Sequence, residues 1–194
     1  RPGWLLSQLR DGLDMRAPNA PPHEDGRSMQ LSEAGARLTA SAPDWEDVKW
    51  VRDQWQGKLV VKGVLRVDDA LKAAEIGADA ISVSNHGGKV LDAAPAALSV
   101  LPEISEAVGT RIEVLLDGGV RRGADVVRAR ALGAKAVMIG RPYLWGLACR
   151  GGRGVSEVLS LFERGMRSTL RQIGCPSFEA LNRDWIYTLS ADAI

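Results

Sequence analysis

The sequence has few cysteines and no long apolar run, and both scarcities exclude classes of protein. Cys149 and Cys175 are the only cysteines among 194 residues, and neither lies in a CxxC or other metal-ligand spacing. A disulfide framework and a metal site are therefore not expected, and a reducing cytoplasm fits this cysteine usage. No run approaches the roughly 18 apolar residues of a spanning helix, so we expect no integral membrane segment.

An excess of charge of one sign is also absent. The chain carries 25 Lys and Arg against 24 Asp and Glu, a net charge of +1 at pH 7, and the basic residues are scattered. A basic stripe is the electrostatic mark of nucleic-acid binding, so nucleic acid is not expected as a partner. With 45% hydrophobic residues, the chain can bury a core as one domain.

Residues 1–44 differ in composition and periodicity from the rest of the chain. They are rich in proline, show little periodicity and include the polar stretch 21–28, so we expect a long, exposed and partly mobile loop. The chain begins with Arg1 instead of Met, from which we expect a fragment of a longer protein. Asp44 can cap a helix that begins at Trp45, and regular structure is expected from there on.

Beyond residue 44, short apolar runs alternate with amphipathic stretches. The runs are rich in branched residues, as is typical of strands buried on both faces, and cover 59–61, 80–83, 112–116 and 136–139. Each amphipathic stretch precedes a glycine suited to a left-handed helix stop: 67–76 before Gly77, 95–108 before Gly109 and 122–132 before Gly133. A last helix is predicted over 154–173. This alternation predicts right-handed βαβ units and a parallel α/β sheet.

Four such units fit two architectures. A closed (β/α)8 or TIM barrel needs eight units and about 250 residues, so residues 45–194 would form half of its wall, with four parallel strands and flanking helices. A small open doubly wound sheet is the alternative. In both, ligands bind at the C-terminal ends of the strands, so the residues after each run are the candidates for chemistry.

Glycines and arginines follow the third and fourth runs. Asp117, Gly118, Gly119, Val120 and Arg121 come after the third, and Gly140 and Arg141 after the fourth. Glycine lets backbone N–H groups approach a phosphate, and an arginine fork binds phosphate oxygens. These strand ends predict a phosphate site, although tight turns with solvated arginines would use the same residues.

His86 and Lys62 follow the second and first runs. His86 lies between a polar strand end and two glycines, where it can act as a general base, although a loop histidine can also simply be exposed. Lys62 can stabilise a developing anion or form a Schiff base at the barrel mouth, or extend into solvent. The other histidine, His23, lies in the polar loop and is interpreted as a surface residue.

Taken together, the strand ends carry a family resemblance that covers residues 45–186. Lys62-Gly63 and the stretches SNHGGKVLD (84–92), LLDGGVRRG (115–123) and IGRPYLWGLA (139–148) occur in one order and spacing. In these motifs the chain resembles the C-terminal half of the FMN-dependent α-hydroxy-acid dehydrogenases and oxidases, which include lactate-, glycolate- and mandelate-oxidising enzymes. The resemblance implies a TIM-barrel flavoprotein oxidoreductase with FMN as cofactor, and a homo-oligomer at full length.

The resemblance also implies roles for single residues. His86 matches the catalytic base, which takes a proton from the substrate as two electrons pass to flavin N5. Lys62 matches the lysine beside flavin N1 and O2, while Ser84 and Asp117 match contacts to the flavin and its ribityl chain. The cofactor-binding set is completed by the phosphate cradle and the residues within it: Gly118, Gly119, Val120, Arg121, Gly140 and Arg141.

Two departures from the family pattern affect the expected activity. Lys89 stands where most relatives have the arginine that binds the substrate carboxylate, and lysine keeps the charge but not the two-pronged grip. Lys89 and the tail YLWGLA also resemble members that oxidise a peptide-derived substrate in mycofactocin maturation. The family's first four strands, with the aspartate that orients the histidine, have no counterpart. Residues 1–44 are therefore expected to be the loop after strand four, and the chain alone a poor enzyme.

Three functions stay open on the sequence. The first is oxidation of a small L-2-hydroxy acid such as lactate to the 2-oxo acid by the intact protein, with His86 as base and Lys89 on the substrate; a peptide-derived substrate is its main variant. The second is a non-catalytic half-barrel that at most binds FMN or a phosphate. The third is a phosphate-binding lyase or isomerase with a Schiff base on Lys62.

Overall fold

A computed structural model describes residues 2–11, 20–40 and 42–187 of the chain. The chain divides into two compact units, residues 1–48 and residues 49–194, and each is described by itself. No helix in the described ranges combines the length and the apolar composition that crossing a bilayer requires. Nor do the described residues bring three or more potential metal-binding side chains together.

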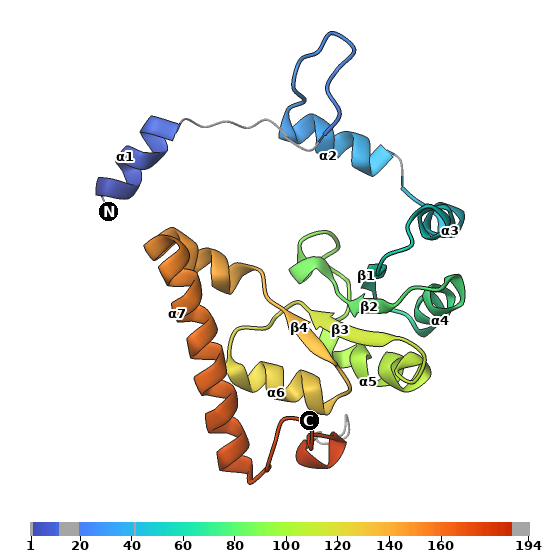
Figure 1. Ribbon diagram of the computed structural model, residues 1–194, viewed down its shortest axis with the longest axis vertical. Coiled ribbons are helices and arrows are strands. Elements are labelled where there is room, and N and C mark those ends of the chain that lie inside the picture. The colour runs from blue at the N-terminus through green and yellow to red at the C-terminus, as the bar shows by residue number, and fades with distance from the viewer. Residues whose placement is uncertain (1, 12–19, 41, 188–194) are drawn as a thin grey trace. The chain divides into compact units, whose positions relative to one another are not determined.

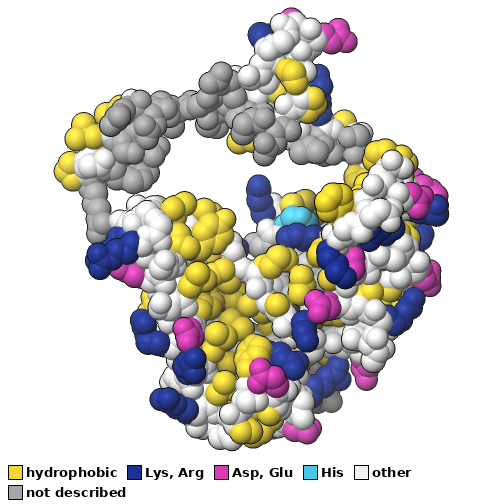
Figure 2. Space-filling view, in the orientation of Figure 1, with side chains coloured by type: hydrophobic (Ala, Val, Ile, Leu, Met, Phe, Trp, Pro, Cys, Tyr) yellow, Lys and Arg dark blue, Asp and Glu magenta, His cyan; other side chains and the backbone are white. Residues whose placement is uncertain are grey.

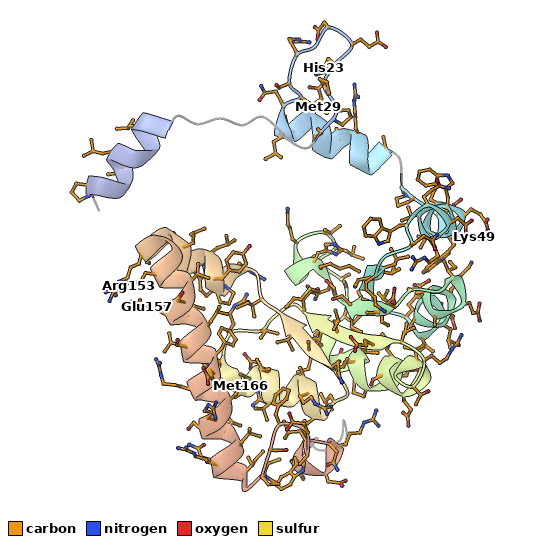
Figure 3. All side chains as sticks on the ribbon, viewed as in Figure 1. His23, Met29, Lys49, Arg153, Glu157 and Met166 are labelled. Carbon is orange, nitrogen blue, oxygen red and sulfur yellow. The ribbon has the colours of Figure 1, made fainter. Side chains whose placement is uncertain are left out.

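The first unit contains two helices where the sequence analysis predicts a loop. Helix α1 spans Pro2–Asp11 and α2 spans Leu31–Ala40 (Figure 1). In α2, an acidic residue in the first turn, Glu33, and a basic residue in the last turn, Arg37, interact favourably with the helix dipole. This local signal is weak beside the irregular composition of residues 1–44. Met29 is buried, and His23 Nε2 lies 3.1 Å from a Glu33 carboxylate oxygen (Figure 3). His23 is thus engaged in a local polar contact.

Helix α3, Trp45–Gln54, begins where the capping residue predicts. Asp44 Oδ1 accepts hydrogen bonds from the backbone N–H groups of Glu46 at 2.9 Å and Asp47 at 3.1 Å. These bonds satisfy backbone donors that have no partner within the helix. The helix start predicted at residue 45 is confirmed.

The second unit is built on a parallel sheet of four strands in the order β1-β2-β3-β4 (Figure 1). The strands are β1 Val60–Val64, β2 Ala80–Val83, β3 Glu113–Asp117 and β4 Ala136–Met138. Helices α4 Val67–Ile76, α5 Ala97–Val108 and α6 Gly123–Ala131 connect successive strands. The predicted alternation of strand and helix is confirmed, and it brings all four C-terminal strand ends to one edge of the sheet.

The core lies between the two central strands and their helices. Ile81 and Val83 of β2 and Leu101 of α5 are fully buried. The outer strands are less covered, because Val60 of β1 is 45% exposed and Met138 of β4 is 37% exposed. Each outer strand has a neighbour on one side only, so the sheet is open at both edges.

One predicted helix end needs correction, and one helical segment was missed. Gly77 and Gly133 have the left-handed conformation expected of a helix stop, with φ of 91° and 109°, but Gly109 is right-handed with φ of −62°. Its N–H donates to Ser105 O at 2.8 Å, so the chain simply completes another helical turn there. Helix α7 spans Arg141–Ile173 with a break at Arg150 and Gly151: the part after the break agrees with the helix predicted over 154–173, and the part before it was not predicted. Pro142 in its first turn favours helix initiation at this earlier point.

Helices α6 and α7 pack closely through two glycines (Figure 1). A Cβ atom on Gly123 would stand 2.2 Å from Met166 N, and one on Gly165 would stand 3.1 Å from Gly123 N. Met166 packs beside the buried cluster of Val127, Ala131, Cys175 and Leu181 (Figure 3). The contact fixes α7, whose N-terminal end follows strand β4.

Hydrophobic side chains remain exposed near the start of α7 (Figure 2). Leu144, Trp145 and Leu147 are 47%, 56% and 46% exposed. Large exposed apolar side chains are unusual when they gather in one place on a soluble protein surface.

The short helices η1 His86–Gly88 and η2 Arg183–Trp185 complete the unit. The first follows β2 at the edge where the strands end, and it carries the predicted catalytic histidine.

Candidate functional site

The C-terminal strand ends surround one cavity of about 750 Å³. Nearly all of the predicted site residues line it: Lys62, His86, Lys89, Asp117, Gly118, Gly119, Val120, Arg121, Gly140 and Arg141. Ser84 does not line the cavity but is hydrogen-bonded to Lys62 and Asp117, which do. The sequence-predicted set is therefore brought together at one edge of the sheet, and Arg121 and Arg141 share the same cavity.

Lys62, Ser84 and Asp117 form a hydrogen-bonded cluster across three strands. Lys62 Nζ donates to Ser84 Oγ at 2.8 Å and lies 2.9 Å from Asp117 Oδ2. Ser84 Oγ donates to Asp117 Oδ1, also at 2.8 Å. Parallel register explains the cluster, because Lys62 pairs with Ser82 on β2 and Ser82 pairs with Leu115 on β3, two residues before Asp117.

The environment of Asp117 keeps its carboxylate ionised. Burial by itself would raise the pKa of Asp117, but hydrogen bonds from Lys62, Ser84 and Ser82, with the nearby Lys62 charge, hold the pKa below its ordinary value. The Lys62 ammonium in turn has a fixed partner while its side chain stays 43% exposed. The cluster thus presents one anchored cation to the cavity.

Ser82 was not among the predicted site residues. It is completely buried, and its Oγ donates to Asp117 Oδ2 at 2.8 Å. The signal was available, because Ser82 and Ser84 lie two residues apart in an otherwise apolar strand and alternate side chains share one face. Two hydroxyls on one face of a buried strand indicate a polar partner on the neighbouring strand.

Gly63 is a second residue that sequence reasoning did not select. It has φ of 99° and lies at an irregularity in the pairing of β1 with β2. A Cβ atom there would stand 3.1 Å from His86 Cε1, so the missing side chain leaves room for the imidazole. The glycine after Lys62 therefore brings the histidine ring close to the end of β1.

His86 itself adopts an unusual backbone conformation. Its φ is 54°, and its N–H donates to Ser84 Oγ at 3.1 Å. Left-handed φ is uncommon for a residue with a side chain. Lys89, which is exposed, follows directly after η1, and both His86 and Lys89 line the cavity.

Two arginines and three glycines also line the cavity. Arg141 Nη2 donates to Gly87 O at 3.0 Å, and the Arg121 guanidinium lies over the Trp145 ring, 5.5 Å from its centroid. Gly119, with φ of 77°, and Gly140 have open space where a Cβ would stand. Gly118 differs, because the amide oxygen of Asn85 fills that space at 2.8 Å. Its lack of a side chain is explained by packing against Asn85.

These strand ends define a class of protein: a parallel α/β fold with a phosphate-compatible cavity and a histidine beside it. The family model described as FMN-dependent dehydrogenase matches residues 1–188. The chain belongs to the FMN-dependent dehydrogenase family, and its cofactor is FMN.

Individual relatives agree with this assignment. The chain is 50% identical over 186 residues to pre-mycofactocin synthase of Mycolicibacterium smegmatis, covering 93% of this chain and 46% of that protein. It is 52% identical to L-lactate dehydrogenase of Caulobacter sp., covering 94% and 49%. Among solved structures, the monotopic membrane protein (S)-mandelate dehydrogenase superposes with a TM-score of 0.81 at 38% identity, covering 96% and 49%. The chain thus spans about half the length of the relatives it matches, which confirms the prediction of half a (β/α)8 barrel with four parallel strands.

The cavity residues fit FMN in charge and in space. A phosphate needs cationic forks and close backbone approach, which Arg121, Arg141 and the open positions at Gly119 and Gly140 can provide. An isoalloxazine ring that becomes negatively charged on reduction needs a nearby cation, and Lys62 is held at the same cavity by Asp117.

Proposed function

We propose that, in the full-length protein, this chain supplies the flavin site and the base for oxidation of an L-2-hydroxy acid of the lactate type to the 2-oxo acid. The observation that carries the proposal is the single cavity that His86, Lys62, Lys89 and the two arginines share. This reaction needs a base, a cation held in place beside the flavin, an ammonium for the substrate and a site for the flavin phosphate.

Each residue has a defined task in this proposal. Arg121 and Arg141 bind the FMN phosphate together with the backbone at Gly118, Gly119, Val120 and Gly140. Lys62 and Asp117 contact the ring and its ribityl chain, and the buried Ser84 holds both in place through its hydroxyl. FMN, when bound, supplies the acceptor for two electrons. Lys89 pairs with the substrate carboxylate, and His86 removes the substrate proton.

A variant lacking the base tests the proposal directly. His86→Ala should retain FMN but lower the rate of flavin reduction by about 10²–10⁴-fold, because proton removal loses its acceptor. The measurement is anaerobic bleaching of the flavin absorbance by L-lactate and L-mandelate. His23→Ala, at the histidine that contacts Glu33 in the other unit, is the matched control and should keep the rate. Near-normal bleaching of the His86 variant would rule out the assignment.

A peptide-derived substrate is the second candidate, and two observations favour it. The 50% identity to pre-mycofactocin synthase is one, and Lys89 in place of the expected arginine is the other. A lysine offers a mobile ammonium instead of a planar fork, so a small carboxylate is held less firmly. The exposed position of Lys89 is compatible with a substrate larger than lactate.

Lys89→Arg separates the two candidates. If the substrate is a small hydroxy acid, the guanidinium should bind its carboxylate with two N–H groups and tighten binding by about 1 kcal/mol. If the substrate is peptide-derived, the larger side chain should obstruct it or contribute nothing. Flavin-reduction titrations of both proteins with L-lactate and L-mandelate measure the difference. Failure of both acids to bleach either protein contradicts the lactate-type reaction and favours the peptide-derived substrate.

A cytoplasmic location and a homo-oligomeric state complete the proposal. The first follows from the cysteine usage and the second from the family, and both stay predictions. The assignment of residues 1–44 to a partly mobile barrel loop after strand four is also a prediction.

A further inference from the structure

The backbone around His86 is held in a conformation that its own residue types do not explain. Among residues 2–11, 20–40 and 42–187, His86 is the one residue other than glycine with positive φ. Gly87 and Gly88 continue the left-handed conformation with φ of 70° and 73°. Glycines adopt this conformation readily, but a histidine there must be held by its surroundings.

Asn85 makes several of the contacts that hold this turn, beside Ser84 Oγ, which accepts from His86 N–H, and Arg141, which donates to Gly87 O. Its Oδ1 accepts from Gly87 N–H at 3.0 Å, directly after the histidine, and its Nδ2 donates to Pro95 O at 3.2 Å. Its own carbonyl oxygen accepts from Gly88 N–H at 3.0 Å. Asn85 therefore fixes the peptide after His86 and ties it to the segment that precedes α5.

The amide of Asn85 is also fixed from the opposite side. The space where Gly118 would carry a Cβ lies 2.8 Å from Asn85 Oδ1, so the end of β3 leaves room for this amide and for little else. Both ends of the amide are used, and the turn it closes sets the direction in which the imidazole leaves the backbone. The ring then lies against Gly63, at 3.1 Å from the place of a Cβ there.

We infer that Asn85 is a positioning residue that holds His86 in its left-handed conformation and so directs the imidazole into the cavity. The inference rests on the proposed function for its catalytic consequence, and on geometry alone for its effect on the turn. Asn85 does not act on the substrate; it acts through the histidine that follows it.

Three variants of the FMN-loaded, full-length protein test the inference. Asn85→Ala removes both side-chain hydrogen bonds. Asn85→Asp keeps an acceptor for Gly87 N–H but cannot donate to Pro95 O. Asn182→Ala is the matched control, because Asn182 Oδ1 accepts from Asp184 N–H at 3.0 Å in the same kind of turn, at η2.

Two measurements are made on each variant. Hydrogen exchange of residues 84–90 should rise about tenfold or more in Asn85→Ala and less in Asn85→Asp. The rate constant for flavin reduction should fall about 30- to 100-fold in the alanine variant, because a small misplacement of a reacting group costs about this much. Substrate binding and FMN affinity should change less than about threefold. Asn85→Asp should have an intermediate rate, and Asn182→Ala should match the unchanged protein in both measurements.

The outcomes separate this inference from the proposed function. Unchanged exchange in Asn85→Ala overturns the inference, whatever the activity. Faster exchange with an unchanged reduction rate overturns it as well, because the turn would then not matter to the base. If no hydroxy acid bleaches even the unchanged protein, the proposed function fails, and the exchange rates of the alanine and aspartate variants still decide whether Asn85 holds the turn. Should the alanine variant not fold, Asn85→Asp decides: faster exchange at residues 84–90 together with slower flavin reduction supports the inference, and wild-type values of both contradict it.

Discussion

At the scale of single residues, Asp117 links the cavity to the interior of the sheet, because its carboxylate contacts both Lys62 at the cavity and the buried Ser82. It receives hydrogen bonds from two buried serines and pairs with Lys62, while its side chain is only 14% exposed. A buried carboxylate of this kind stabilises the fold as long as it stays ionised.

Asp117→Asn should therefore lower stability in a pH-dependent way. The folded-state pKa of Asp117 is below its ordinary value, so its contribution is fully present above the unfolded pKa and is lost as the pH falls through the folded pKa. At pH 7 the free energy of unfolding should drop by about 1.5–3 kcal/mol, because hydrogen bonds to a charged group are lost. The difference between the two proteins should shrink as the pH falls below about 4, as measured by denaturant unfolding.

Asp68→Asn provides the control for this change. Asp68 pairs with Arg66 on the surface, where both side chains are more than 70% exposed, so the same loss of charge should have little effect. Equal losses in the two variants at pH 7, or a difference that does not shrink as the pH falls below about 4, would contradict the role assigned to Asp117.

The residues of this cluster show what a sequence can and cannot reveal. Lys62 and Asp117 were predicted because each follows an apolar run, and Ser84 was predicted from the family resemblance. Ser82 was not predicted, although its two-residue spacing from Ser84 was visible. Gly63 and Asn85 could not be selected from sequence, because their importance depends on which atoms of His86 and Gly118 approach them.

At the scale of elements, strand and helix order was predictable because hydrophobic period and glycine positions are local properties. The N-terminal helices α1 and α2 were not predicted, since short helices in a proline-rich stretch leave a weak periodic signal. The part of α7 before Arg150 and Gly151 was missed for a related reason: it is a short helical segment that this break separates from the longer periodic stretch. The close approach of α6 and α7 could not be predicted either, because it depends on contacts between residues far apart in the sequence.

The contact between α6 and α7 gives a prediction at this scale. Gly123→Ala should lower the free energy of unfolding by about 3 kcal/mol, because its Cβ would overlap backbone atoms of α7 that cannot move independently. Thermal or denaturant unfolding measures the effect. Gly152→Ala is the matched control, since no atom lies within 4 Å of its Cβ position and alanine favours a helix. A Gly123 variant as stable as the control would show that the two helices pack less closely than described.

At the scale of the whole molecule, the four-stranded sheet with two open edges brings most of the predicted cofactor-binding residues to one cavity. This follows from parallel topology, because every strand contributes its C-terminal end to the same edge. Fold class and family could be predicted from sequence for the same reason: each strand end is a short local motif. The substrate could not, because it depends on Lys89 and on parts of the relatives' length that this chain does not span.

The most direct test of a phosphate site at the strand ends compares the binding of FMN with that of riboflavin, which lacks the phosphate. Apoprotein is titrated with each flavin by fluorescence, for the unchanged protein, Arg141→Ala and the control Arg167→Ala, whose arginine pairs with Glu163 on the surface of α7. If Arg141 binds the phosphate of FMN, the unchanged protein and the control should both prefer FMN over riboflavin. Arg141→Ala should lose about 10- to 100-fold of that preference while its riboflavin affinity is nearly unchanged. An FMN preference that survives in Arg141→Ala, or an unchanged protein that binds both flavins equally, would contradict the phosphate site at these strand ends.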